Sequence, residues 1–266
     1  MGAKELLSQH QLSAAIAELN QDIKKQPTDA RLRTFLFELL CFAGDYERAK
    51  RQLDVVGHQN EKVGIGVEVY KSILRAEIAR RRFFTEGIKP TFLFDVPEHV
   101  TLYEDAQNQL REGHSGEAKA LYARAAQVRT EIRGRLKGNP FASFRDSDDR
   151  LVGILEVIVR DSYIWIPFER IRKVIISQPK HLRDLLWIPA SVEMENAPVG
   201  EVFLPVIYAG SELESDDKVR LGRVTEWVDL GGGLAGGIGQ KTFLVDDREV
   251  SILELGELEF QVLAAV

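Results

Sequence analysis

The sequence predicts an α+β protein in which tetratricopeptide-like α-helical repeats precede a β-rich α+β domain. Three observations support this: a repeat with the 34-residue tetratricopeptide period, a change from helical to strand periodicity, and a change in charge. Residues 1–138 carry 22 Lys and Arg against 19 Asp and Glu, whereas residues 139–266 carry 13 against 22. We therefore expect a tetratricopeptide-like helical domain at 1–138 and a β-rich C-terminal domain at 139–266. The helix-stopping sequence Gly138-Asn139-Pro140 marks the boundary.

The repeat consists of small and large apolar residues at equivalent positions. Ala15 and Leu19 in the first copy lie 34 residues before Ala49 and Leu53 in the second. A third copy, Gly113–Tyr122, begins 69 residues after the second, which is close to two periods. A small alanine lets antiparallel helices approach closely, and the large residue four positions later lies on the same helical face. The pattern predicts paired helices, with a chance match in an ordinary helical bundle as the alternative.

Longer apolar stripes predict further helices in the first half. One helix is expected over Glu61–Gly87, and a pair over Val100–Glu112 and Ser115–Leu136. The run Arg80–Arg82 is expected on a solvated helix face near a C-terminus, where positive charge suits the helix dipole; an anion-binding patch is the alternative. Cys41 lies in an apolar helical run and is expected in the core.

The second half has the patterns of β-strands. Leu151–Val159 is a continuous apolar run, and Tyr163–Pro167 follows it as the second arm of a hairpin. One helical turn is expected at Leu182–Trp187. Further short strands are expected at Arg172–Ser177, Glu201–Tyr208, Gly222–Leu230 and Lys241–Asp247. Short strands at regular spacing predict a mainly antiparallel sheet or a small barrel.

Composition excludes several classes of protein. The single cysteine excludes an internal disulfide framework and a multi-cysteine metal site. No apolar run reaches the length of a membrane span, so no membrane partner is expected. The N-terminal residues lack the apolar core of a secretory signal, and a cytoplasmic location is the expectation. The acidic second half does not favour nucleic acid as a partner.

The search for catalytic and ligand-binding motifs finds no site. The glycines of the stretch 231–239 have the spacing of a dinucleotide-binding loop, but a strand pattern follows them instead of a helix, so a flexible loop is expected. The five histidines lack ligand-like spacing, and the acidic stretch Asp146–Asp149 lacks the glycine of a calcium loop. We predict no catalytic residue, no metal and no cofactor, and expect that the protein is not an enzyme.

Large aromatic residues stand at the ends of the predicted strands, beside arginines such as Arg170 and Arg183. Aromatic residues in this setting usually complete a core, but they also anchor protein–protein contacts. The residues for which both roles stay open are Trp165, Pro167, Phe168, Glu169, Arg170, Asp184 and Trp187.

The same region resembles a known family. Segments Asp148–Val159, Tyr163–Ile171 and Leu182–Ala190, followed by the stretch Leu204–Leu230, have the order and spacing of the ImpE family, also called TagJ or SciE-type proteins. The resemblance also covers the repeat-like N-terminal half and the Lys89–Leu93 turn. It implies that residues 139–266 are a C-terminal domain of the ImpE type.

The resemblance implies a function that the residue chemistry does not show. Proteins of this family are cytoplasmic accessory components of bacterial type VI secretion, linked to the contractile sheath that is built from TssB and TssC. Some members are reported to bind TssB and to assist sheath turnover by the ATPase ClpV. The implied function is a non-enzymatic adaptor that binds TssB and assists sheath assembly or ClpV-dependent turnover.

A tetratricopeptide array presents a concave groove lined by the first helix of each repeat. In this chain the expected groove mixes aromatic, apolar and charged side chains, which suits an amphipathic partner helix. The predicted groove residues are Arg31, Thr34, Glu38, Cys41 and Phe42 from one repeat and Val100, Tyr103, Gln107, Leu110 and Arg111 from another.

Two alternatives remain beside the helical adaptor. The protein could be a scaffold that acts mainly through its acidic β domain, or an enzyme whose acidic turns or glycine-rich stretch hold a ligand. Partner binding that survives removal of residues 139–266 would favour the adaptor, whereas a deep pocket with convergent polar groups would favour the enzyme. The sequence predicts no oligomeric state.

Overall fold

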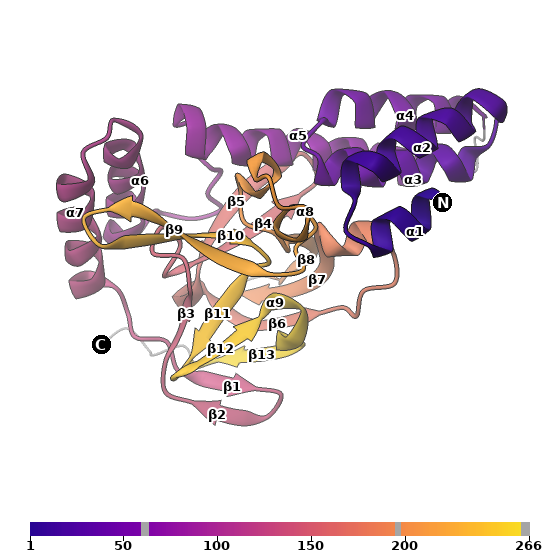
Figure 1. Ribbon diagram of the computed structural model, residues 1–266. Coiled ribbons are helices and arrows are strands. Elements are labelled where there is room, and N and C mark those ends of the chain that lie inside the picture. Colours follow the sequence, from indigo (N-terminus) through magenta and orange to yellow (C-terminus); the bar gives the residue numbers. More distant parts are fainter. Residues whose placement is uncertain (60–63, 195–197, 262–266) are drawn as a thin grey trace.

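The computed structural model describes residues 1–59, 64–194 and 198–261. Helices fill most of the described chain as far as residue 128 (Figure 1). Their bounds are α1 Ala3–Ser8, α2 Leu12–Lys25, α3 Ala30–Phe42, α4 Tyr46–Gln59, α5 Gly64–Glu86, α6 Glu98–Arg111 and α7 Ser115–Val128. Neighbouring helices pack in sequence order, most extensively α3 with α4 and α6 with α7. The predicted helical first half is therefore present.

The equivalent positions of the repeat share both packing and turn geometry. The three alanines are fully buried between helices: Ala15, Ala49 and Ala118. Gly44 and Gly113 adopt positive φ angles of 72° and 82° and end the helices before them. His10, which lies 34 residues before Gly44, takes the same left-handed conformation with φ of 58°. A pattern visible in the sequence thus corresponds to repeated helix–turn–helix units.

Strands form most of the second half. Their bounds are β1 Gly134–Leu136, β2 Asn139–Phe141, β3 Phe144–Asp146, β4 Ile154–Val159, β5 Ser162–Pro167, β6 Ile171–Ile176, β7 Trp187–Met194, β8 Pro198–Pro205, β9 Thr225–Gly231, β10 Leu234–Gly239, β11 Thr242–Val245, β12 Arg248–Ser251 and β13 Glu257–Phe260. The short connecting helices are η2 Phe168–Arg170, η3 Leu182–Leu185, η4 Ser211–Leu213, α8 Asp217–Arg220 and α9 Ile252–Leu255.

Eight strands form one sheet in the order β2-β1-β13-β6-β7-β8-β4-β5. A two-stranded sheet of β9 and β10 and a three-stranded sheet in the order β12-β11-β3 lie beside it (Figure 1). Every strand pair in these sheets is antiparallel. The prediction of an α+β fold with a mainly antiparallel sheet is confirmed.

Two predicted elements are wrong. The helix expected to reach Leu136 ends at Val128, and the chain then forms β1, in which Gly134 pairs with Phe260. The sheet therefore begins before residue 139, the expected start of the β-rich domain. The stretch 231–239, expected as a flexible loop, supplies β10, which pairs with β9. Both misreadings have one cause, because these strands are set by pairing with partners that local periodicity does not reveal.

Helices and strands share their hydrophobic cores. One cluster joins α2–α5 to the eight-stranded sheet, and a second joins the end of α5, α6 and α7 to β4 and β5. Helix α5 packs against β4 and β5 and connects the two groups of helices (Figure 1). Residues of the helical half therefore share their hydrophobic cores with strands of the same chain.

Candidate functional site

A network of buried charged side chains joins α5 to the sheet. At its centre, Glu156 of β4 accepts hydrogen bonds from Arg80 Nε at 2.7 Å, from Lys241 Nζ at 2.6 Å and from the Tyr163 hydroxyl at 2.7 Å. The Glu156 side chain is fully buried, and those of Arg80 and Lys241 are 2% exposed. Burial alone would raise the pKa of Glu156, but the two cations hold it well below its ordinary value.

The network continues toward the helices through Arg80. Its Nη1 donates to Glu77 Oε1 at 2.9 Å and its Nη2 donates to the carbonyl of Ile207 at 2.9 Å. The other oxygen of Glu77 accepts from the indole nitrogen of Trp187 at 3.0 Å. The expectation that Arg80 lies on a solvated helix face is therefore wrong, because its main partner lies 76 residues further along the chain. Arg82 is exposed, as expected.

On the sheet side, the network reaches the acidic stretch that begins with Asp146 at the end of β3. Lys241 Nζ lies 2.9 Å from Asp146 Oδ2 and 4.7 Å from the centre of the Tyr208 ring. Burial raises the pKa of Asp146 to about 6, although Lys241 opposes the shift. Asp148 pairs with Arg150 and accepts from the backbone N–H of Gly237 in β10 at 2.8 Å. The charged groups therefore neutralise one another and hold strands and helix together.

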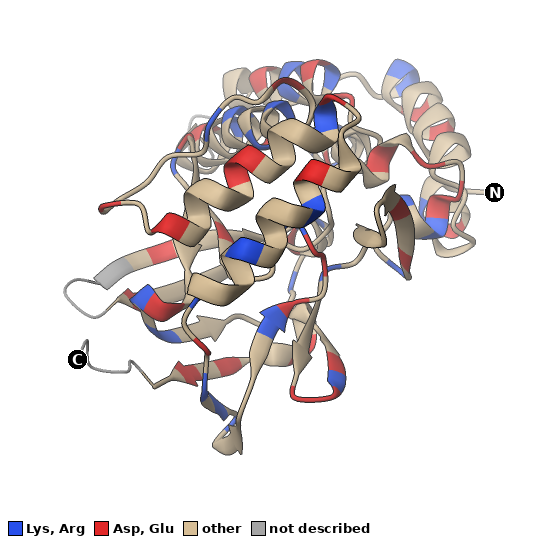
Figure 2. Ribbon diagram, turned by 90° about the vertical axis from the view of Figure 1, so that its left-hand side faces the viewer, with Lys and Arg blue, Asp and Glu red and all other residues tan. Residues whose placement is uncertain are grey.

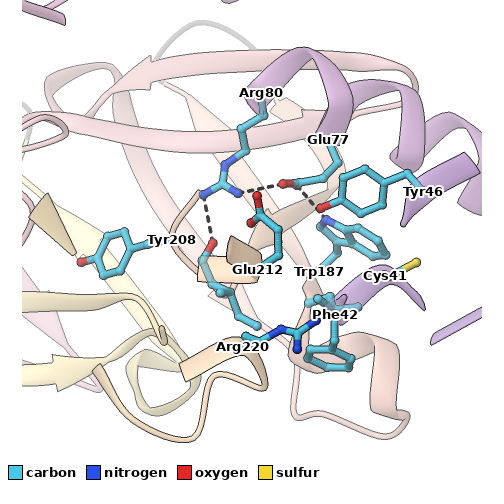
Figure 3. A pocket seen from close by; sticks show the side chains of 11 residues that line it. Cys41, Phe42, Tyr46, Glu77, Arg80, Trp187, Tyr208, Glu212 and Arg220 are labelled. Atoms are coloured by element: carbon cyan, nitrogen blue, oxygen red, sulfur yellow. Dashed lines mark hydrogen bonds and ion pairs between the residues drawn. The ribbon is translucent and has the colours of Figure 1, made fainter. Parts of the chain in front are cut away.

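A small hollow lies beside this network, between the helices and the sheet (Figure 3). Glu77 and Arg80 border it from α5, and Glu212 and Arg220 border it from the segment η4–α8. Its volume is about 20 Å³, which is room for a single water molecule. Among the described residues, no group of three His, Cys, Asp or Glu side chains is placed to hold a metal ion. The hollow offers no room for an organic substrate.

A larger hollow opens between the first helices and is named here the α3–α5 cleft. Its volume is about 380 Å³. The lining is mostly apolar and comes from three helices and one 3-10 turn: Thr34 and Phe37 of α3, Leu53 and Val56 of α4, Gly66, Val67 and Tyr70 of α5, and Arg183 of η3. This combination of apolar walls with a few polar groups is typical of a binding cleft.

Arg183 is held in a fixed orientation at the cleft. Its Nε donates to the Tyr70 hydroxyl at 2.7 Å, and its Nη1 donates to Glu38 Oε1 at 2.9 Å. The guanidinium also lies over the Tyr70 ring, 4.9 Å from the ring centre. Burial raises the pKa of Glu38, while Arg183 opposes that rise. The guanidinium is therefore held in one orientation by groups of its own chain.

A second hollow, the α5–β8 groove, lies on the other side of the same helix. It has a volume of about 860 Å³ between α5 and strands β4 and β8. Ile65 and Val69 of α5 line it and are 86% and 38% exposed. Its charged rim is mixed, with Glu68, Arg160 and Glu201. The N-terminal half of α5 thus separates two surfaces with different charge.

Acidic and basic residues both occur along the chain on the side of α6 and α7. In the view of Figure 2, they are interspersed along the ribbon of the helices and strands. Over the described chain, no helix is long and apolar enough to pass through a membrane.

The structure divides the predicted groove residues into two groups. Arg31 is exposed, Thr34 lines the α3–α5 cleft, and Glu38 borders it through Arg183. Leu110 and Arg111 are half-buried. The residues that are at least nine-tenths buried are Glu38, Cys41, Phe42, Val100, Tyr103 and Gln107. The prediction that these six face an open groove is wrong, because each is packed inside the protein; of the six, Glu38 reaches the edge of the α3–α5 cleft through its hydrogen bond to Arg183.

The residues that could either complete the core or anchor a protein contact lie mainly in the core. Trp165, Pro167, Phe168, Asp184 and Trp187 are buried, whereas Glu169 and Arg170 are half-buried. Glu169 lies 3.2 Å from His99 Nε2, and the guanidinium of Arg170 lies over the ring of Phe94. The aromatic members therefore pack the fold instead of forming a surface patch. Sequence analysis missed Tyr70 and Phe37 as cleft residues, since both have the spacing of ordinary core positions.

Comparison with known proteins assigns the chain to a family. The sequence model described as "ImpE protein" matches residues 138–259. The type VI secretion system accessory component TagJ of Pseudomonas aeruginosa strain PAO1 is 36% identical over 261 residues, which covers 98% of this chain and 92% of the relative. The chain belongs to the ImpE family. The resemblance inferred from the strand motifs is thereby confirmed.

The fold of the whole chain is also seen in a crystal structure. Protein VPA1032 from Vibrio parahaemolyticus superposes with a TM-score of 0.90 and is 26% identical, and the match covers 97% of both chains. Helical repeats and sheet are therefore arranged alike in the two proteins.

Proposed function

We propose that this protein is a non-enzymatic accessory component of a bacterial type VI secretion system. The observation that carries the proposal is the nearly full-length similarity to a TagJ protein that bears this description. Similarity over both the helical and the strand-rich halves supports a shared role of the whole chain. On this proposal the protein acts in the cytoplasm and needs no cofactor.

The partner that we propose is the sheath subunit TssB, and the role is to assist sheath assembly or ClpV-dependent turnover. The strand motifs that resemble the family support this choice. The geometry supports a binding role: the α3–α5 cleft is apolar and concave, and it contains an ordered arginine. The charged groups of the interior, in contrast, pair with one another around Glu156.

The experiment is a pull-down of purified protein with the cognate TssB, full-length and without its N-terminal helix. We expect binding to the full-length subunit and loss of binding when the helix is removed. Circular dichroism of the shortened TssB serves as the folding control. Absence of binding to both forms would disprove the TssB-adaptor function for this protein.

A further inference from the structure

We propose that the outer edge of β9 is a self-association surface, at which two copies of this protein pair as antiparallel strands related by a two-fold axis. The edge consists of the outward backbone groups of Thr225, Trp227 and Asp229 and is named here the β9 edge. The inference goes beyond the proposed function and does not depend on it, because its test uses this protein alone.

The hydrogen bonds of β10 show which way the residues of the β9–β10 hairpin point. Ala235 donates its N–H to Asp149 Oδ2 at 2.8 Å and accepts from the Asp149 N–H at 3.1 Å. Gly237 donates to Asp148 at 2.8 Å, and Gly239 donates to a serine hydroxyl at 2.7 Å. The N–H groups of these three β10 residues therefore point away from β9 and are satisfied within the same chain.

The β9 residues opposite them are consequently open. In the register of the hairpin, Asp229, Trp227 and Thr225 lie directly opposite these three β10 residues. Directly opposite residues of an antiparallel pair exchange either both backbone hydrogen bonds or neither. The backbone groups of all three β9 residues therefore point outward, and among the residues that the structure describes none of these groups has a hydrogen-bond partner. An open row of this kind is a template for another strand.

The β9 edge is accessible to a second molecule. Glu226, Trp227 and Asp229 are exposed, and Trp227 is 43% exposed. In Figure 1 the hairpin lies between α7 and α8, with α8 against β10. Helix α7 contacts the end of β9, where Gly231 lies beside Ser115. The open residues precede that end.

The edges of the eight-stranded sheet, in contrast, are protected. A separate segment is bonded to β5, since Thr91 donates to the carbonyl of Tyr163 at 2.8 Å and accepts from the N–H of Trp165 at 3.3 Å. Strand β2 is three residues long and has Pro140 at its centre. Short length, proline and lysine are common protections against pairing at an edge. Strand β9 is seven residues long, and its sequence contains neither proline nor lysine.

The pattern of open residues determines the register of the pair. All the open groups are paired only when Trp227 lies opposite Trp227 of the second copy. This register places Thr225 opposite Asp229 and Glu226 opposite Val228, so no carboxylate directly faces another. A two-fold axis at Glu226 or at Asp229 would set that acid against its own copy, which disfavours those registers.

The aromatic side chains favour the same register. The ring centre of Trp227 lies 6.2 Å from that of Tyr208, which is buried. Pairing around Trp227 brings the two tryptophans together in a row with one tyrosine at each end. Aromatic cross-strand pairs add stability beyond that of the backbone hydrogen bonds.

The first measurement is sedimentation velocity over a concentration series, for which we expect a reversible dimer. Trp227→Pro removes the outward N–H without removing a hydrogen bond to β10, and its ring obstructs a second strand. Trp227→Thr is the matched control, because it loses the same contact with Tyr208 but keeps the N–H. We expect the dimer of Trp227→Pro to be roughly tenfold weaker or more than that of Trp227→Thr, since two hydrogen bonds are lost across the axis.

Amide hydrogen exchange of the natural protein, followed by NMR, tests the edge without a substitution. The amides of Glu226 and Val228 face β10 and should exchange slowly at every concentration. The amides of Thr225, Trp227 and Asp229 should exchange slowly in the dimer and roughly tenfold faster or more after dilution to the monomer.

Each contrary outcome overturns the proposal. One is a protein that stays monomeric up to about 1 mM. Another is a dimer in which the amides of the β9 edge exchange as rapidly as in the monomer, because the copies would then meet elsewhere. Equal dimerisation of folded Trp227→Pro and Trp227→Thr would have the same meaning. Protection of the β9 edge only in a complex with TssB would assign the edge to a different partner.

Discussion

Glu156 has three partners from distant parts of the chain: Arg80 of α5, Tyr163 of β5 and Lys241 near β11. Each partner would be costly to bury alone, because an unpaired charge loses its hydration without compensation. The carboxylate satisfies both cations and the hydroxyl at once. A single residue therefore couples the helical half to the sheet.

Removal of the charge at Glu156 tests this coupling. Glu156→Gln leaves Arg80 and Lys241 buried with fewer counter-charges, and we expect the free energy of unfolding to fall by about 3–5 kcal/mol. Urea denaturation followed by circular dichroism measures the loss. Glu86→Gln is the control, since Glu86 pairs with Arg82 on the exposed face of α5 and should cost below about 0.5 kcal/mol. Equal losses for the two variants would contradict a central role for Glu156.

His99 makes stability depend on pH. Burial, with a contribution from Arg129, lowers the pKa of His99 to about 4. The unfolded chain therefore binds a proton near pH 6.5 that the folded chain does not accept, so stability falls as the pH falls from 6.5 toward 4. From pH 7.5 to pH 5 this histidine should cost about 2 kcal/mol.

The comparison with His99→Gln tests the contribution of His99 together with its contact to Glu169, which lies 3.2 Å from His99 Nε2 and whose pKa is raised by burial. Asp146, with its raised pKa of about 6, changes stability in the opposite direction over the same range, and it does so in both proteins. Urea titrations at pH 7.5 and pH 5 should show a smaller acid-induced loss in His99→Gln than in the natural protein. Identical losses would show that His99 does not control this pH dependence.

At the scale of elements, β10 is a strand whose glycines have a packing role. Gly237 faces the Tyr208 ring, and a Cβ at Gly237 would overlap it. The backbone N–H of Gly237 also donates to Asp148. The tyrosine in turn donates to Asp146, so the close approach of β10 positions part of the charge network.

A methyl group at Gly237 should therefore disturb the hairpin. We expect Gly237→Ala to lower the free energy of unfolding by about 1–3 kcal/mol, which is the usual cost of overpacking. Gly116→Ala is the matched control, because Gly116 lies exposed in α7 and its Cβ would meet open space. That change should be neutral or stabilise by up to about 1 kcal/mol. Thermal unfolding that ranks the two variants in reverse would refute this role of β10.

The predictability of each element follows from the range of the interactions that form it. The helical repeats were predicted correctly because Ala49, Leu53 and Gly44 report local packing and turn geometry. β1 and β10 were missed because their identity depends on pairing with Phe260 and with β9. The groove was predicted from the helices alone, and the sequence does not show that Phe42 and Tyr103 are buried in cores shared with strands. Of the predicted groove residues, Thr34, which lies one helical turn from Arg31, lines an open cleft.

At the scale of the whole molecule, the two hydrophobic clusters each combine helices with strands. Contacts at the surface reinforce the connection. The backbone N–H of Leu12, at the start of α2, donates to Asp217 of α8 at 2.7 Å, and Arg81 pairs with Glu212. The halves that the sequence separates by charge and periodicity are therefore one unit in packing.

This shared core predicts a single cooperative unfolding transition. In differential scanning calorimetry we expect one peak, with a calorimetric enthalpy equal to the van 't Hoff enthalpy. A fragment of residues 1–138 loses the strands that share hydrophobic cores with Phe42 and Tyr103, and it leaves Arg80 without Glu156. We expect this fragment to show no cooperative transition. Loss of TssB binding by this fragment would then report unfolding and would not locate the partner site. Two separate peaks, or a fragment that unfolds cooperatively, would show that the helical half is an independent domain.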